Sequence, residues 1–281
     1  MRVTHLFFLG MLPLAVGERA ARQDALEAVE DDIQSRKEEH TSRGVDKWGS
    51  GGPPKPSQYC KAYPITDATK TNLNAALERR AYGSSLPADD ELLDAAEKGD
   101  MTRLCALIHH WDQLADVPVK DHRRDAGKTS LPKKPNLDAG AGAYSGLGMT
   151  PLLYAVKKNN KNMLYALLAA GATVDRANSE GETPLIYAAI LRNTGLFEPL
   201  LAYKARTDVQ SNPAAGGKTI MHYCSDYEYS KYYEVWRKFK KTSAKDLRDS
   251  RGRTALQEAE LLEGGEISMP RCAKMMGSTK V

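Results

Sequence analysis

Histidine and cysteine are the residue types in this 281-residue chain that are best suited to catalysis or metal binding. The adjacent pair His109-His110 would point in different directions on a helix, and no partner four residues away completes a metal site. His222 is expected to pack and hydrogen-bond inside the fold. No Ser/His/Asp or Cys/His arrangement can be assembled around the six histidines,. We therefore predict no catalytic residues, no metal and no enzyme activity.

The four cysteines, Cys60, Cys105, Cys224 and Cys272, lie 45, 119 and 48 residues apart. That spacing gives neither a CxxC motif nor a pair of metal ligands. An even number permits disulfides in an oxidising compartment, although a chain of this size can build its core without them. Cys224 replaces a small core residue and is predicted to be a buried thiol. The sequence leaves open whether any of the cysteines pair.

Two glycine-containing segments invite a nucleotide-binding interpretation. The motif AGKTS around Lys128 lacks the glycine that a Walker loop needs, because that position is His122,. The segment GAGAYSG, residues 140–146, lacks the GxGxxG spacing, and no strand is expected before either segment,. We predict no cofactor.

The first 17 residues, MRVTHLFFLGMLPLAVG, resemble a secretory signal peptide. Arg2 is a positive start, an apolar run follows, and Ala15 and Gly17 occupy the small-residue positions before a cleavage point. The apolar run is too short to span a bilayer of roughly 30 Å. We predict entry into the secretory pathway, as a secreted or lumenal protein; an organelle reached through that pathway and a cytoplasmic location are the alternatives.

Residues 18–85 are expected to form an acidic arm and a Gly/Pro-rich linker, partly disordered and partly helical. Residues 18–40 contain eight acids against four Lys and Arg, and the linker SGGPPKPSQ spans residues 50–58, where no helix is expected to cross,. A short helix is predicted over 72–82, with ordered packing from about Leu86. Residues 269–281 are a C-terminal tail.

A nine-residue phrase recurs downstream and sets the fold. GMTPLLYAV at 148–156 returns as GETPLIYAA at 181–189, so Thr183 follows Thr150 by 33 residues; Thr219 follows after 36 and Thr254 after 35,. Each threonine can cap a helix, and proline suits the first helical position. A second apolar stripe and Gly171 then predict a second helix and its left-handed end.

These residues resemble ankyrin repeats. The resemblance implies an all-α solenoid of about five helix-turn-helix units over residues 86–268, with degenerate first and last units. The units are expected near 88–116, at two clear repeats over 148–214, at 217–248 and at 252–268, with an insertion at about 116–148. Only His222 keeps the family's histidine, and a kink is expected at Pro199.

The resemblance further implies a non-catalytic protein-protein interaction module, an adaptor or scaffold, that binds a protein partner through its concave face. The partner-binding positions carried over are Lys157, Lys158, Asn178, Ser179, Glu182, Ile190, Leu191, Lys218, Asp226, Tyr227, Arg251 and Arg253. The formal net charge of +4 is too small to imply nucleic acid, and no obligate homo-oligomer is expected,.

A basic stretch near the C-terminus supports an alternative function. Lys231 to Arg253 contains nine Lys and Arg against three acids. Such an excess suits an acidic protein or an anionic membrane surface. The alternative is therefore an architectural subunit of a larger assembly, or a peripheral membrane binder that docks through this unit.

Overall fold

The computed structural model describes residues 55–81, 87–114, 119–120, 129–130, 134–140, 147–223, 229–261 and 276–277. All of them belong to the unit Pro53–Val281, and residues 1–52 form a separate unit. The predicted signal peptide, residues 18–54 and all but two residues of the predicted tail lie outside the described residues, as does Cys224.

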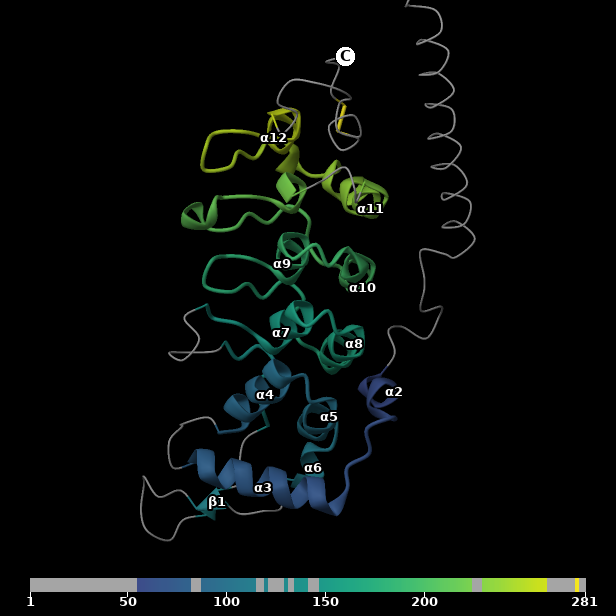
Figure 1. Cartoon of the computed structure of the whole chain (residues 1–281), viewed down its shortest axis with the longest axis vertical. Helices are drawn as coiled ribbons and strands as arrows, with labels where there is room; N and C mark the ends of the chain where they lie inside the picture. The colour runs from purple at the N-terminus through teal and green to yellow at the C-terminus, as the bar shows by residue number, and fades with distance from the viewer. Residues whose placement is uncertain are drawn as a thin grey trace, which may run out of the picture. The chain divides into compact units, whose positions relative to one another are not determined.

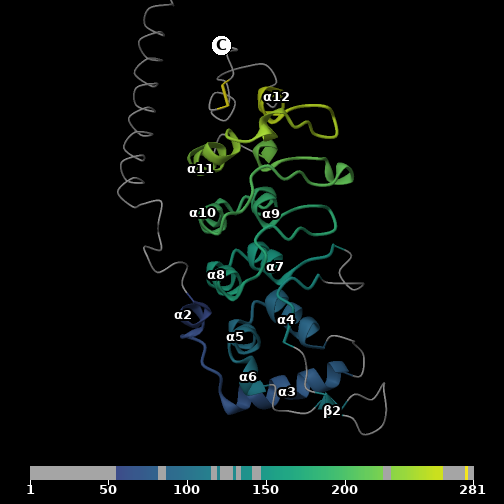
Figure 2. The same ribbon diagram turned by 180° about the vertical axis from the view of Figure 1, so that it is seen from behind.

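Pairs of helices stacked on one another make up most of the described chain (Figures 1 and 2). The first helices are α4 (Pro87–Lys98), α7 (Pro151–Lys157), α9 (Pro184–Ile190), the 3-10 helix η4 (Ile220–Tyr223) and α12 (Ala255–Leu261). Each contacts the next along this series. The second helices are α5 (Met101–His109), α8 (Lys161–Ala170), α10 (Phe197–Ala202) and α11 (Tyr229–Phe239). The predicted helical solenoid is confirmed.

The second and third units begin and end as the repeated phrase predicts. The Thr150 hydroxyl accepts a hydrogen bond from the Leu153 N–H at 3.2 Å, and Thr183 accepts one from Ile186 at 3.4 Å. Proline follows each threonine at the first helical position. Helix α8 ends at Gly171, which has φ 102°. The caps satisfy backbone donors that a helix start leaves unpaired.

Polar turns between the units hydrogen-bond to one another along the stack. The Ser179 N–H donates to the Leu147 carbonyl at 2.9 Å, and the Asn212 N–H donates to the Glu180 carbonyl at 2.7 Å. Gly181 has φ +75°, and a Cβ atom there would lie 2.6 Å from Asn212 Oδ1. Only glycine therefore fits at this point, because both the backbone conformation and the neighbouring turn exclude a side chain.

Pro199 does not kink a helix as predicted. The chain between the two helices of the third unit forms a 3-10 turn, η2 (Thr194–Leu196), and α10 begins only at Phe197. Pro199 consequently lies in the first turn of α10, where a missing N–H leaves no helical hydrogen bond unmade. Helix α10, which contains this proline, is six residues long.

Ordered packing begins earlier than the predicted Leu86. Helix α2 (Pro56–Cys60) starts within the predicted linker, with proline at its first position, and α3 (Asp67–Ala81) extends the helix predicted over 72–82,. Leu73 and Leu77 of α3 are buried, and α3 contacts α4 and α5. The short helix α6 (Trp111–Leu114) follows α5. Residues 56–81 thus belong to the folded core.

The described parts of the 116–148 insertion include two short strands, β1 (Val119–Lys120) and β2 (Thr129–Ser130), which pair antiparallel. Asp89 of α4 accepts a hydrogen bond from the Asn136 N–H at 2.7 Å. The 3-10 helices η3 (Pro213–Ala215) and η6 (Ser243–Asp246) complete the elements. No helix in the described ranges combines the length and apolar character that crossing a membrane requires.

Candidate interaction surface

The loops that join the two helices of the second and third repeats lie next to each other. In the second repeat, Lys157 and Lys158 are exposed where α7 ends. In the third, α9 ends at the half-buried Ile190, and the following Leu191 is 37% exposed. Asn193 Nδ2 donates to the Val156 carbonyl at 2.8 Å, which joins the two loops. The structure therefore brings these four predicted site residues to one edge.

Two further cations belong to the same edge. Arg192 is exposed, with φ 57°, and Lys161 is exposed at the first position of α8. A Cβ atom at Gly195 of the third repeat would lie 3.7 Å from Lys161 Nζ. We define the basic edge as Lys157, Lys158, Lys161, Arg192 and the exposed Leu191. Among the residues that the structure describes, none of its four cations forms an ion pair with a carboxylate.

Asn178 and Glu182, both predicted as partner contacts, are instead part of the turn itself. Each is 7% exposed. Asn178 Nδ2 donates to Glu182 Oε2 at 2.8 Å, and Asn178 Oδ1 accepts from the Glu182 N–H at 2.9 Å. Burial raises the pKa of Glu182, and the hydrogen bond from Asn178 opposes this,. Of the three predicted contacts in this turn, Ser179 is the exposed one.

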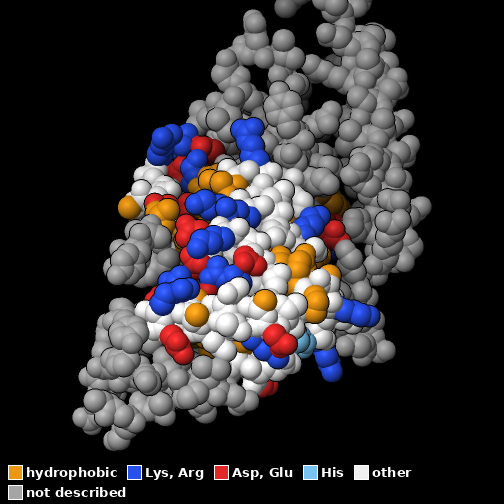
Figure 3. All heavy atoms as spheres, turned by 60° about the horizontal axis from the view of Figure 1, so that its bottom comes forward, with side chains coloured by type: hydrophobic (Ala, Val, Ile, Leu, Met, Phe, Trp, Pro, Cys, Tyr) orange, Lys and Arg blue, Asp and Glu red, His pale blue; other side chains and the backbone are white. Residues whose placement is uncertain are grey.

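The predicted cations of the last two units are paired inside the molecule. Lys218 Nζ lies 3.1 Å from Glu258 Oε1 and sits over the Tyr223 ring. Arg253 pairs with Glu258 and with Asp249, at 3.1 Å from Asp249 Oδ2. Pairing of this kind gives a surface of mixed sign, as Figure 3 shows for one face of the molecule. The third predicted cation here, Arg251, is exposed. The predicted contacts Asp226 and Tyr227 lie outside the described residues.

A tyrosine recurs four residues after the threonine in three successive units: Tyr154, Tyr187 and Tyr223. Tyr154 is buried and the other two are half-buried. Burial raises the pKa of Tyr223 to about 12, and the nearby carboxylates of Glu182 and Glu180 add to this effect. Burial also raises the pKa of Tyr187, so that both of these phenols stay protonated at neutral pH. The constant distance of the three tyrosines from the threonine is part of the repeated phrase.

His222 packs and hydrogen-bonds inside the fourth unit, as interpreted from the sequence. Its Nδ1 accepts from the Thr219 N–H at 3.1 Å, and its Nε2 lies 3.2 Å from the Arg253 carbonyl oxygen. These contacts place the proton on Nε2. Burial lowers the pKa of His222,. The described residues contain no cluster of three or more His, Cys, Asp or Glu that could hold a metal ion.

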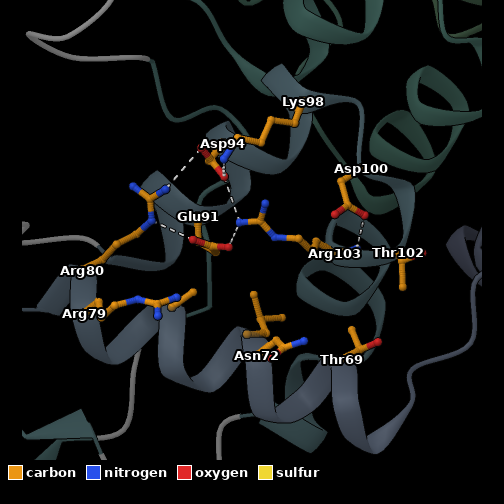
Figure 4. Close-up of a pocket in the computed structure, with 12 residues that line it drawn as sticks. Thr69, Asn72, Arg79, Arg80, Glu91, Asp94, Lys98, Asp100, Thr102 and Arg103 are labelled. Atoms are coloured by element: carbon orange, nitrogen blue, oxygen red, sulfur yellow. Dashed lines mark hydrogen bonds and ion pairs between the residues drawn. The ribbon is translucent and has the colours of Figure 1, made fainter.

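A polar cleft of about 650 Å³ lies between α3, α4 and α5. Figure 4 shows that Arg80, Glu91, Asp94 and Arg103 point toward one another in this cleft. Glu91, whose side chain is 1% exposed, pairs with Arg80 at 2.7 Å and with Arg103. Arg103 also lies 2.9 Å from Asp94 Oδ2. We call Arg80, Glu91, Asp94 and Arg103 the charge cluster. The two arginines and two carboxylates neutralise one another, and their ion pairs link α3, α4 and α5.

A disulfide joins Cys60 of α2 to Cys105 of α5, which settles a pairing that the sequence left open. The two Cα atoms lie 5.5 Å apart, and the side chains are 2% and 0% exposed. Next to it, the Tyr59 ring stacks on Tyr165 of α8 with centroids 5.2 Å apart. Helix α2 is therefore fixed to the second helices of the first two units.

A stack of helix pairs with capped starts, glycine stops and turns that hydrogen-bond to one another defines a helical-repeat solenoid. Within it, residues 92–212 match the family model of ankyrin repeats, in three copies. This part of the chain therefore consists of ankyrin repeats. A comparison with curated proteins found no match. The tyrosine-containing fourth unit and the last half-unit lie beyond the match, and their place in the array rests on their packing against α9 and on each other.

Proposed function

We propose that this protein is a non-catalytic adaptor or scaffold that holds a protein partner at the basic edge. Ankyrin repeats are in general protein-protein interaction modules. The observation that carries the proposal is Leu191, a large apolar side chain that is 37% exposed beside Arg192, in a loop that is joined to the loop of Lys157 and Lys158. Apolar groups placed among such cations are typical of an interface centre with a polar rim.

The size of the array suits this function. A specific complex buries about 800 Å² on each partner. The basic edge covers two repeats, and the exposed Ser179 and Arg251 extend the available surface along the turns. The alternative, docking through the basic C-terminal unit, is less well supported because the described residues between 231 and 253 expose no large apolar side chain. Two cations of this stretch, Arg237 and Arg253, are also paired with Glu234 and Glu258.

The test uses the full chain as bait and compares two leucine variants. Leu191→Ser is expected to lose specific partners that the unchanged protein retains, because it removes the apolar anchor. The matched control is Leu147→Ser, since Leu147 is 40% exposed but lies outside the basic edge. Circular dichroism checks that both variants fold. A set of retained proteins that is the same for all three chains would contradict the proposal.

We also propose that the protein enters the secretory pathway. Two observations support this: residues 1–17 resemble a signal peptide, and Cys60 and Cys105 form a buried disulfide, which persists in oxidising compartments,. Deleting residues 1–17 is expected to leave the chain in the cytoplasm with both thiols reduced. Non-reducing peptide mapping of the full chain measures the pairing. Finding the full chain in the cytoplasm with free Cys60 would contradict this location.

A further inference from the structure

We propose that the partner of the basic edge is an acidic segment of a protein, in which carboxylates flank one apolar side chain. This inference rests on the proposed function and names the chemistry of the partner. The carboxylates would meet Lys157, Lys158, Lys161 and Arg192, and the apolar side chain would meet Leu191. Three observations carry the inference. The cations of the basic edge have no carboxylate partner among the described residues, Lys161 lies at the start of a helix, and Leu191 is exposed beside Arg192.

The sequence around the basic edge contains no acidic residue that could compensate its charge locally. Between Asp138 and Asp175 the chain has no acidic residue, and between Glu182 and Glu198 it has none either. The first of these intervals contains Lys157, Lys158 and Lys161, and the second contains Arg192. Both loops of the basic edge are therefore free of carboxylates of their own. In the charge cluster and at Glu258, by contrast, the cations pair with carboxylates.

The helix dipole explains only part of this pattern. Lys157 lies in the last turn of α7, where the partial negative charge of the helix C-terminus favours a cation,. Lys161, in contrast, is the first residue of α8, and the first turn of that helix has no acid. A cation there faces the positive end of the helix, which is the unfavourable arrangement. Local helix stability therefore does not account for Lys161, whereas attraction to an acidic partner does.

The loops that carry the cations are joined to each other. The Asn193–Val156 hydrogen bond joins the loops of the two repeats, and Lys161 lies beside Gly195 of the neighbouring unit. Each exposed pair with a carboxylate is weak by itself. Several such pairs around one leucine contact favour an extended acidic segment. A membrane surface would be met by cations alone, whereas the basic edge combines its cations with the exposed Leu191.

The test measures binding of three labelled synthetic peptides to the full chain by fluorescence anisotropy. The first has one leucine with four glutamates on each side, the second has glutamine in place of every glutamate, and the third has serine in place of the leucine. We expect the first to bind, with an affinity that falls at least tenfold between 50 and 300 mM salt. The second should not bind detectably, and the third should bind several-fold more weakly than the first.

Variants of the chain locate the site. Combining Lys157→Gln, Lys158→Gln and Arg192→Gln is expected to weaken binding of the acidic peptide at least tenfold. The matched control is Lys204→Gln, because Lys204 is also an exposed cation with a left-handed backbone (φ 66°) in the third repeat. Equal binding of the glutamine peptide, or equal loss with the control variant, would overturn the inference.

Vesicles containing phosphatidylserine provide the competing surface. Binding of these vesicles that the triple variant abolishes, without binding of the acidic peptide, would assign the basic edge to a membrane and overturn the inference. The proposed function and the acidic chemistry of the partner can fail independently of each other. If Leu191→Ser loses a protein partner that the triple variant keeps, the interaction module stands and the acidic chemistry of its partner is wrong.

Discussion

The first unit and the two repeats that follow it are stabilised by different means. In the second and third repeats, Thr150 and Thr183 cap the first helices, and the turns hydrogen-bond to their neighbours. The first unit has no Thr-Pro opening. It is instead joined to α2 by the Cys60–Cys105 disulfide and to α3 by the charge cluster. Regular repeats thus rely on local signals, whereas the end unit relies on contacts from outside the repeat.

The difference follows from the position of the first unit in the stack. A unit inside a solenoid buries both of its faces against neighbours, whereas a terminal unit has one neighbour only. Here α3 covers the free side of α4 and α5 with Leu73 and Leu77, and α2 covers the outer side of α5. Residues 56–81 therefore act as an N-terminal cap. The predictions below test whether this cap stabilises its own end of the array alone.

Removing the disulfide is expected to have the largest effect. Replacing both Cys60 and Cys105 with serine should lower the free energy of unfolding of the first unit by about 2–4 kcal/mol, because a closed loop of 45 residues no longer restricts the unfolded chain,. Hydrogen exchange should accelerate in α2 and α5 and stay unchanged in α9. Equal acceleration in α9 would show that the array unfolds as one unit. The first unit and the regular repeats would then not be stabilised separately.

Breaking the charge cluster is expected to have the next largest effect. Glu91→Gln leaves Arg80 and Arg103 without their most buried anionic partner, which should lower the free energy of unfolding by about 1–3 kcal/mol,. Glu97→Gln on the same helix is the matched control, because Glu97 is exposed. Chemical denaturation monitored by hydrogen exchange in α4 measures both. Similar stability of the two variants would mean that the charge cluster does not contribute significantly to the stability of the first unit.

The regular repeats could be predicted from sequence because each of their signals acts over a few residues. The Thr-Pro start of α7 and α9 and the glycine end of α8 depend only on the local backbone,. The fold class and the family followed from the spacing of these signals. The ends of the array could not be predicted in the same way, because Leu73 and Leu77 alone do not show which surface they cover.

The candidate site was predictable only in part. Lys157, Lys158 and Leu191 are exposed as expected from their place in the repeat, but Asn178 and Glu182 bond to each other instead of reaching a partner. The repeat pattern marks both positions as surface, so it cannot predict that their side chains hydrogen-bond to each other. The Cys60–Cys105 pairing was equally hidden, since four cysteines allow three connectivities.

The smallest expected effect tests the local stabilisation of the regular repeats. Thr183→Ala removes the hydroxyl that accepts the Ile186 N–H, and it should destabilise the third repeat by about 1 kcal/mol,. Thr150→Ala should give a similar loss in the second repeat, because its cap has the same geometry. Hydrogen exchange in α9 and α7 measures the two losses separately. Ser250→Ala is the control, since Ser250 is exposed in a turn. If Thr183→Ala accelerated exchange in α5 as much as in α9, the third repeat would be coupled to the capped end, and the stability of each repeat could not be assigned to its own threonine.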